Sequence, residues 1–202
     1  MVPPPHHVRD VYDRQAASYD AARARSLFEA PWLERLAACL PPRGRVLDLG
    51  CGTGEPIGRW FRERGFGVVG ADISAAMLAI ARERWPDGDW READMRVLDL
   101  GESFDGIVAW DSFFHLTPDE QRGTIPRIGA HLNPGGAVLA TVGPKAAEVW
   151  GTVGGEPIYH ASLSPAEYAD TLEKNGLRLI AFRAEDPDAD RHSVLMARKE
   201  ET

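Results

Sequence analysis

The sequence predicts an α/β fold in which helices flank an open, mostly parallel sheet. Two observations lead to this prediction. Short apolar runs that suit buried strands alternate with segments of helical periodicity along most of the 202 residues. A glycine-rich turn, residues 50–54, stands between the first of these runs and the helix that follows it. Such turns lie at the carboxyl ends of parallel strands, where open α/β sheets bind their ligands.

Helical spacing precedes the first expected strand. Residues 8–40 predict two or three helices, and the run Pro-Pro-Arg-Gly at 41–44 ends this region. The first strand, 45–49, then leads into the glycine-rich turn. We expect one domain over residues 1–202, with residues 1–43 as an N-terminal helical lid and residues 44–202 as the core.

The rest of the chain continues the alternation. Further strands are expected near 67–72, 89–93, 104–111, 137–142, 177–184 and 192–198. Residues 143–160 show no clear period and contain four glycines, so a long lid loop is expected there. The acidic turn between the last two strands is short enough for them to pair antiparallel.

The composition limits the partners. The net charge is −8, which favours neither a nucleic acid nor an anionic membrane. The two cysteines, Cys39 and Cys51, have no metal-ligand spacing and suit a reducing compartment. No apolar run approaches the ~20 residues of a membrane span, and the start has no apolar signal core. We therefore expect a soluble, cytoplasmic protein with no metal site.

Acidic residues end four of the predicted strands: Asp48, Asp72, Asp94 and Asp111. Such a rim repels a pyrophosphate and attracts a ligand that carries an ammonium and a sulfonium, as S-adenosylmethionine (SAM) does. A nicotinamide dinucleotide is the alternative, because Asp72 follows the loop at the distance expected for a ribose contact. The loop spacing, however, is G-x-G-x-G rather than the G-x-G-x-x-G of that class.

Five ordered motifs carry a resemblance to a known family. They are Val46-Leu47-Asp48-Leu49-Gly50-Cys51-Gly52-Thr53-Gly54, Gly70-Ala71-Asp72-Ile73-Ser74, Glu92-Ala93-Asp94-Met95, Phe104-Asp105-Gly106-Ile107-Val108-Ala109-Trp110 and Leu132-Asn133-Pro134-Gly135-Gly136. Together they resemble the class I SAM-dependent methyltransferases of small-molecule type. The resemblance implies a Rossmann-like sheet of seven strands, the last of them antiparallel, with SAM as the cofactor.

The resemblance also implies roles for matching residues. The backbone of Gly50 and Gly52 would line the methionine part, Asp72 would accept from both ribose hydroxyls, and Tyr19 would close over the carboxylate. Ile73 would pack on the adenine, Asp94 with the Met95 N–H would read the adenine edge, and Trp110 would lie beside the methyl donor. The other expected cofactor contacts are Tyr12, Asp48, Cys51, Met77 and Asp111. Two alternatives stay open: Asp48 bonds only the loop amides, and Ile73 belongs to the core.

Two histidines are candidates for a general base, since an imidazole titrates near neutral pH. His115 follows the fourth strand, where an acceptor would meet the methyl group; the alternative is that it caps the next helix or shapes the pocket. His160 in the expected lid loop is the second candidate. His131 and His192 are interpreted as structural.

The sequence therefore predicts a methyltransferase that transfers a methyl group to an O, N or C nucleophile of a small metabolite or natural product. The Asn/Asp-Pro-Pro-aromatic signature of amino-directed nucleic-acid methyltransferases is absent after the fourth strand, where 110–113 reads Trp-Asp-Ser-Phe. The alternatives are a nicotinamide-dependent oxidoreductase and a non-catalytic SAM-binding protein. The sequence indicates no oligomeric state.

Overall fold

The computed structural model describes residues 7–201, and the first residues of the predicted lid lie outside this range. The strands are β1 (Arg45–Leu49), β2 (Gly67–Asp72), β3 (Asp89–Glu92), β4 (Phe104–Ala109), β5 (Leu132–Val142), β6 (Ala147–Val153), β7 (Glu156–Ser162), β8 (Leu177–Asp186) and β9 (His192–Lys199). The α-helices are α1 (Val8–Ala22), α2 (Ala30–Ala37), α3 (Ile57–Glu63), α4 (Ala75–Arg84), α5 (Pro118–Ala130) and α6 (Pro165–Glu173). Short 3-10 turns are η2 (Met95–Val97), η3 (Phe113–His115) and η4 (Pro187–Ala189).

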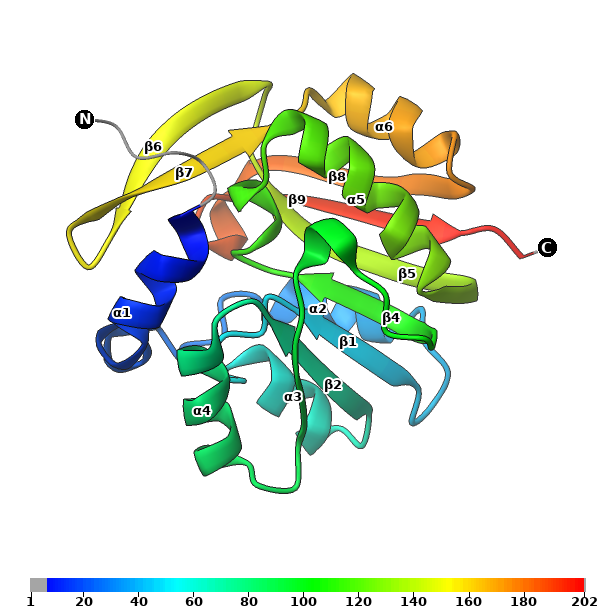
Figure 1. Cartoon of the computed structure of the whole chain (residues 1–202). Helices are drawn as coiled ribbons and strands as arrows, with labels where there is room; N and C mark the ends of the chain where they lie inside the picture. Colours follow the sequence, from blue (N-terminus) through cyan, green and yellow to red (C-terminus); the bar gives the residue numbers. More distant parts are fainter. Residues whose placement is uncertain (1–6, 202) are drawn as a thin grey trace.

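Seven strands form one sheet in the order β3-β2-β1-β4-β5-β9-β8 (Figure 1). The first five in the chain pair in parallel, and β9 inserts antiparallel between β5 and β8. The predicted α/β fold with an antiparallel last strand is thus confirmed. The central strands are covered on both faces, which explains why their sequences are apolar almost throughout.

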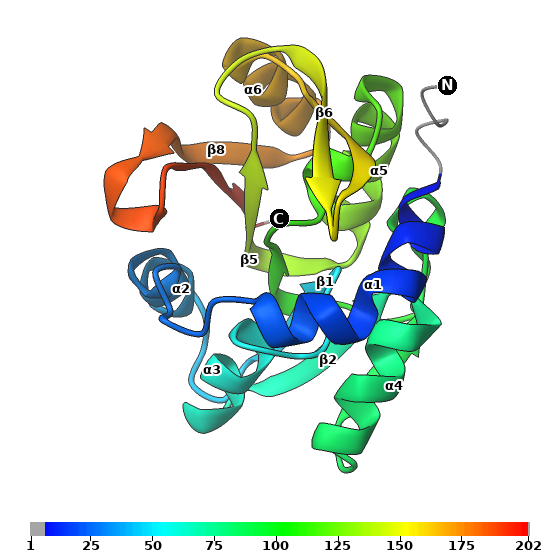
Figure 2. The same ribbon diagram turned by 90° about the vertical axis from the view of Figure 1, so that its left-hand side faces the viewer.

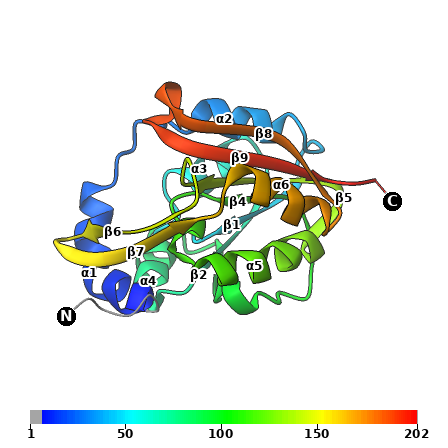
Figure 3. The same ribbon diagram turned by 90° about the horizontal axis from the view of Figure 1, so that it is seen from above.

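Helices cover both faces of the sheet, and α2 and α5 lie on opposite sides (Figure 3). One apolar cluster joins α2 and α3 to the sheet around Trp32 and Phe61. A second cluster joins α5 and α6 to the other face around Ile125 and Tyr168. Two packed faces leave the carboxyl ends of the strands as the place where a ligand can enter.

The predicted lid loop at 143–160 is wrong in its secondary structure. Most of this segment belongs to β6 and β7, which form a two-stranded antiparallel hairpin outside the main sheet. The turn holds Gly154 and Gly155, with φ of 58° and 82°. Positive φ at both central residues is what a tight two-residue hairpin requires, so the glycines mark a turn rather than a long loop.

Helix α1 lies across the carboxyl ends of the sheet. Viewed from that side, α1 passes in front of β1 and β2, and the β6–β7 hairpin stands next to it (Figure 2). Arg14 and Gln15 of α1 both donate to the Glu156 carboxylate of β7, which joins the helix to the hairpin. Within residues 7–201, no helix combines the length and the apolar character needed to cross a membrane.

Candidate active site

The glycine-rich turn has a conformation that only glycine adopts easily. Gly50, Gly52 and Gly54 have φ of 81°, 53° and 76°. A Cβ on Gly50 would lie 2.2 Å from the Cβ of Ser112, whereas a Cβ on Gly52 would meet nothing within 4 Å. The turn therefore packs tightly against the segment after β4 and leaves open space at Gly52, where a ligand can approach the main chain.

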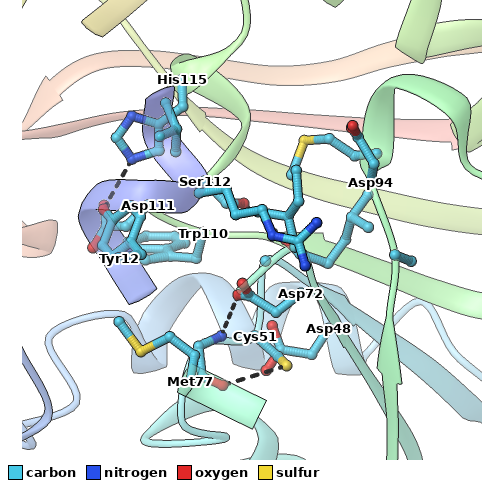
Figure 4. Close-up of a pocket in the computed structure, with 18 of the residues that line it drawn as sticks. Tyr12, Asp48, Cys51, Asp72, Met77, Asp94, Trp110, Asp111, Ser112 and His115 are labelled. Carbon is cyan, nitrogen blue, oxygen red and sulfur yellow. Dashed lines mark hydrogen bonds between the residues drawn. The ribbon is translucent and has the colours of Figure 1, made fainter. Parts of the chain in front are cut away.

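This turn borders a pocket of about 1060 Å³, its open mouth included (Figure 4). All the predicted cofactor contacts line it: Tyr12, Tyr19, Asp48, Gly50, Cys51, Gly52, Asp72, Ile73, Met77, Asp94, Met95, Trp110 and Asp111. Six carboxylates and three arginines are among its lining residues. The four strand-ending acids, distant in the sequence, thus meet in one predominantly acidic cavity.

Asp72 is tied to the glycine-rich turn. Its carboxylate accepts hydrogen bonds of 2.8 Å from the backbone N–H groups of Gly52 and Ser74. Burial raises the pKa of Asp72 above its usual value. Burial also raises the pKa of Asp48 to about 7, and the negative charge of Asp72 adds to this effect. Two neighbouring carboxyl groups thus share the floor of the pocket.

Asp94 has a partner that the sequence analysis did not identify. The Arg96 guanidinium donates to its carboxylate at 2.6–2.9 Å, and the Arg96 backbone N–H donates as well. Burial raises the pKa of Asp94, but the hydrogen bonds from Arg96 lower it by more, so the net pKa is lowered. This carboxylate is therefore held ionised at the far side of the pocket from Tyr12 (Figure 4).

Trp110 and Asp111 follow β4 directly. The Trp110 side chain is buried and lines the pocket, and its Nε1–H has no hydrogen-bond partner among the described residues. A buried donor without a partner is uncommon in folded proteins and is suited to a ligand acceptor. Asp111 lies beside it with a positive φ of 52°, a conformation that is strained for a residue with a side chain.

His115 lines the pocket and is hydrogen-bonded to Tyr12. Its Nδ1 lies 3.0 Å from the Tyr159 carbonyl oxygen, which can only accept, so Nδ1 carries the hydrogen. The Nε2 lone pair then accepts from the Tyr12 hydroxyl at 3.0 Å (Figure 4). Burial lowers the pKa of His115 to about 4. The imidazole is thus neutral near pH 7, and both its nitrogens are engaged.

His160 does not line the pocket. It lies in β7 behind His115, with the two ring centroids 5.0 Å apart, and also packs on Phe114. Burial lowers its pKa as well. The structure therefore brings the two candidate bases together but exposes only His115 to the cavity.

Several lining residues were missed at the sequence level, foremost Arg23. Its guanidinium donates to Glu29 at 2.5 Å and lies 3.6 Å from the Asp111 carboxylate. Arg23 lies just beyond α1 in no recognisable motif, so no sequence signal could have identified it. Ser112 was missed too, although its position next to Asp111 was a usable signal; its hydroxyl donates to the Leu49 carbonyl at 2.7 Å.

Metal ligation has no candidate in this part of the molecule. No group of three or more His, Cys, Asp or Glu side chains within residues 7–201 is arranged to hold a metal ion. The lining is instead made of glycine backbone, carboxylates and aromatic rings, which suits an organic ligand.

Residues 46–136, which supply most of this pocket, match the family model of a methyltransferase domain. Over these residues the chain is similar to a methyltransferase domain. The resemblance found in the five motifs is thereby confirmed, and the domain match spans β1 through the first half of β5.

Individual relatives agree with this assignment. The chain is 35% identical over 101 residues to dTDP-3-amino-3,4,6-trideoxy-alpha-D-glucopyranose N,N-dimethyltransferase of Streptomyces venezuelae, over 49% of this chain and 42% of that protein. It is 38% identical over 104 residues to trans-aconitate 2-methyltransferase of Azoarcus sp., over 50% of this chain and 39% of that protein. The chain thus spans about half the length of the curated relatives it matches.

Solved structures share the methyltransferase fold over nearly the whole chain. SAM-bound CalS10, an amino pentose methyltransferase from Micromonospora echinaspora, matches with a TM-score of 0.72 and 22% identity, over 92% of this chain and 96% of that one. The CcbJ methyltransferase from Streptomyces caelestis matches with a TM-score of 0.75 and 21% identity, over 98% of this chain and 100% of that one. These likenesses extend the fold assignment to the N-terminal helices and to the hairpin.

Proposed function

We propose that the chain is a SAM-dependent methyltransferase that acts on an O, N or C nucleophile of a small molecule. The observation that carries the proposal is the pocket itself, where four strand-ending acids meet behind a G-x-G-x-G turn. An acidic cavity favours a ligand with an ammonium and a sulfonium over a pyrophosphate. The curated relatives named above are methyltransferases of small molecules, which supports the same class.

The residues present fit SAM. Two features offer contacts that the protein itself leaves open: the unpaired Nε1–H of Trp110 and the uncrowded main chain at Gly52. We assign the ribose hydroxyls to Asp72 and the adenine side to Ile73, Asp94 and Met95, all of which border the pocket. Tyr12, Tyr19, Asp48, Gly50, Cys51, Met77 and Asp111 complete the proposed cofactor site.

When bound, SAM supplies a methyl group that is already activated by the sulfonium. The chain must then orient the nucleophile in line with this methyl group and exclude water. We propose that α1 and the β6–β7 hairpin do this as a lid within a single domain. His115 contributes through Tyr12: its neutral Nε2 fixes the hydroxyl hydrogen, so that the Tyr12 oxygen is available as an acceptor toward the pocket. We propose no contact of His160 with either reactant; it supports the His115 ring.

A binding experiment tests the proposal. The full chain is titrated with S-adenosylhomocysteine and, separately, with NAD in a thermal-shift assay, and each affinity is confirmed by calorimetry. We expect stabilisation by S-adenosylhomocysteine alone. Asp72→Ala should weaken that affinity by at least about tenfold, because a hydrogen bond to a charged group is lost. The matched control is Asp89→Ala, which changes an exposed acid at the amino end of β3, away from the pocket.

The same assay separates the alternatives. Stabilisation by NAD without any by S-adenosylhomocysteine would identify a nicotinamide-dependent oxidoreductase and would refute the proposal. A non-catalytic SAM-binding protein would bind S-adenosylhomocysteine but would transfer no label from methyl-labelled SAM to any component of a small-molecule extract.

A further inference from the structure

Asp111 is held in place by two neighbouring strands. Its backbone N–H donates to the Thr141 hydroxyl of β5 at 2.8 Å, and Thr141 is only 1% exposed. This bond helps to maintain the left-handed conformation of Asp111, which is strained for a non-glycine residue. Strain of this kind persists only where the surroundings enforce it, and here it directs the carboxylate toward the pocket wall that Tyr12 and Trp110 share (Figure 4).

His192, the first residue of β9, is the direct partner of this carboxylate. Its Nε2 lies 2.9 Å from Asp111 Oδ1, and its Nδ1 lies 2.8 Å from the Ala189 carbonyl oxygen. Neither the carbonyl nor an ionised carboxylate has a hydrogen to donate, so both ring nitrogens must carry one. In this geometry His192 is an imidazolium.

The surroundings of His192 favour its charged form. The ring stacks on Phe28, with centroids 5.3 Å apart, and lies tilted over Trp110 at 5.6 Å; aromatic faces attract cations. Burial lowers the pKa of His192, but the hydrogen bonds to Asp111 and Ala189 and the nearby Asp190 charge raise it by more. The net rise in pKa agrees with the two donated hydrogen bonds.

The other charges near this pair come from the segment between α1 and α2. Arg23 Nη2 lies 3.6 Å from Asp111 Oδ2, beyond hydrogen-bond length, while the same nitrogen donates to Glu29 at 2.5 Å. Glu29 is fully buried, and its other oxygen has no partner among the described residues. Arg23 therefore forms an ion pair with Asp111 but donates its hydrogen bond to Glu29, so Asp111 Oδ2 can still accept a hydrogen bond from a ligand in the pocket.

We infer that Asp111 receives the methyl acceptor: its second carboxylate oxygen, Oδ2, accepts a hydrogen bond from the N–H or O–H of the nucleophile, and His192 is the positioning residue that holds the carboxylate. This inference rests on the proposed function and names the substrate class. The acceptor is an amine or a hydroxyl compound whose nucleophilic atom bears a hydrogen. A carboxylate nucleophile would bring two anions together at Asp111, which is unfavourable.

The methyl transfer needs no reactant other than SAM and the acceptor. The nucleophile's lone pair forms the bond to the methyl carbon, and the carbon–sulfur bond breaks with its electron pair left on sulfur. The acceptor hydrogen stays hydrogen-bonded to Asp111 during transfer and is released to water as a proton afterwards. Asp111 thus orients the lone pair and stabilises the positive charge that develops on the nucleophile.

Sinefungin is a probe that does not require the acceptor to be known. It is a SAM analogue in which an amine-bearing carbon replaces the methylated sulfur, so its ammonium lies where the methyl group and the nucleophile meet. Calorimetry on the full chain would compare sinefungin with S-adenosylhomocysteine at pH 7. We expect Asp111→Asn to weaken sinefungin by about tenfold or more, as for loss of a charge-assisted hydrogen bond. S-adenosylhomocysteine, which has no ammonium at this position, should lose clearly less affinity than sinefungin. Asparagine tolerates the left-handed backbone, so this variant is expected to fold.

Two measurements test the role of His192: the protonation state of its ring, and the effect of replacing it compared with a control variant. Nitrogen NMR at pH 7 should show both ring nitrogens of His192 protonated, with deprotonation above the ordinary pKa of about 6.5. The sinefungin preference, which is the affinity for sinefungin relative to that for S-adenosylhomocysteine, should decline in the wild-type chain at alkaline pH as His192 loses its proton. His192→Gln should lower this preference severalfold and remove the decline that His192 causes. Asp188→Asn changes an exposed acid of the neighbouring η4 turn that does not line the pocket, and it should leave the preference within about twofold.

The outcomes are distinct. If the wild-type chain binds neither ligand, the proposed function fails. If S-adenosylhomocysteine binds but Asp111→Asn leaves the sinefungin preference unchanged, Asp111 does not face the acceptor and the inference is overturned. A neutral His192 ring at pH 7, or an unchanged pH profile in His192→Gln, would refute the positioning role alone.

Discussion

The Tyr12 hydroxyl lies 3.0 Å from His115 Nε2, and this hydrogen bond joins α1 to the segment that follows β4. Because His115 Nδ1 is committed to the Tyr159 carbonyl, the three groups form a chain from the pocket wall to the β6–β7 hairpin. Helix α1, the segment after β4 and the hairpin are thus joined by two consecutive hydrogen bonds.

Removing this path should affect transfer more than cofactor binding. We expect Tyr12→Phe and His115→Ala to reduce the rate of methyl transfer by about tenfold or more. This rate is measured with methyl-labelled SAM once an acceptor has been identified. Affinity for S-adenosylhomocysteine should remain within about threefold. His115→Ala also leaves the Tyr12 hydroxyl without its buried partner, so unfolding in urea should show a loss of about 1–3 kcal/mol. Unchanged turnover in both variants would remove His115 from the mechanism.

The glycine-rich turn offers a matched pair of substitutions. Gly50 and Gly65 have nearly equal φ of 81° and 82°, but a Cβ would clash with Ser112 only at Gly50. Gly65→Ala should cost about 1 kcal/mol of stability from backbone strain and leave S-adenosylhomocysteine binding intact. Gly50→Ala should abolish detectable binding in calorimetry. If the two variants lost the same amount of S-adenosylhomocysteine affinity, backbone strain alone, and not the close packing of the turn on Ser112, would explain the loss.

Asp48 should make stability depend on pH. Its pKa in the folded protein is about 7 against 3.8 for an unperturbed group. The folded state therefore binds more protons than the unfolded state between these values. This contribution to stability is fully present below about pH 4 and declines as the pH rises through 7.

Asp48→Asn should remove that decline, because the amide does not ionise. The free energy of unfolding of the variant relative to wild type should rise by a few kcal/mol, up to roughly 4, between pH 4 and 8. Urea denaturation at unit pH steps measures it. Asp72 has a raised pKa too, but it is present in both proteins, so the difference reports mainly Asp48. A pH-independent difference would contradict the assignment.

Asp20 connects the end of α1 to the glycine-rich turn. Its carboxylate accepts from the Thr53 hydroxyl and from Arg84 of α4, both at 2.6 Å. Asp20→Asn should loosen α1, which hydrogen exchange would detect as about tenfold faster exchange of α1 amides. Affinity for S-adenosylhomocysteine should fall severalfold. Asp10→Asn, the same change at an exposed position of the same helix, is the control, and equal exchange in the two variants would argue against a lid.

The sequence determined the sheet, the glycine-rich turn and the four strand-ending acids. These features follow from local rules: apolar runs predict buried strands, positive φ demands glycine, and residues at the carboxyl ends of parallel strands share one edge. The same rules failed at 143–160, where four glycines indicated a loop. Two of them instead form the turn of a hairpin whose strands have no partner in the main sheet.

Only the tertiary structure decided how the polar groups are used. Arg23 belongs to no motif, His192 was interpreted as structural, and His115 was a candidate general base with a structural role as the alternative. In the folded chain His192 meets Asp111, which is distant in the sequence, and His115 has both nitrogens occupied. Protonation and reactivity depend on burial and on partners brought together by folding, so periodicity along the chain cannot predict them.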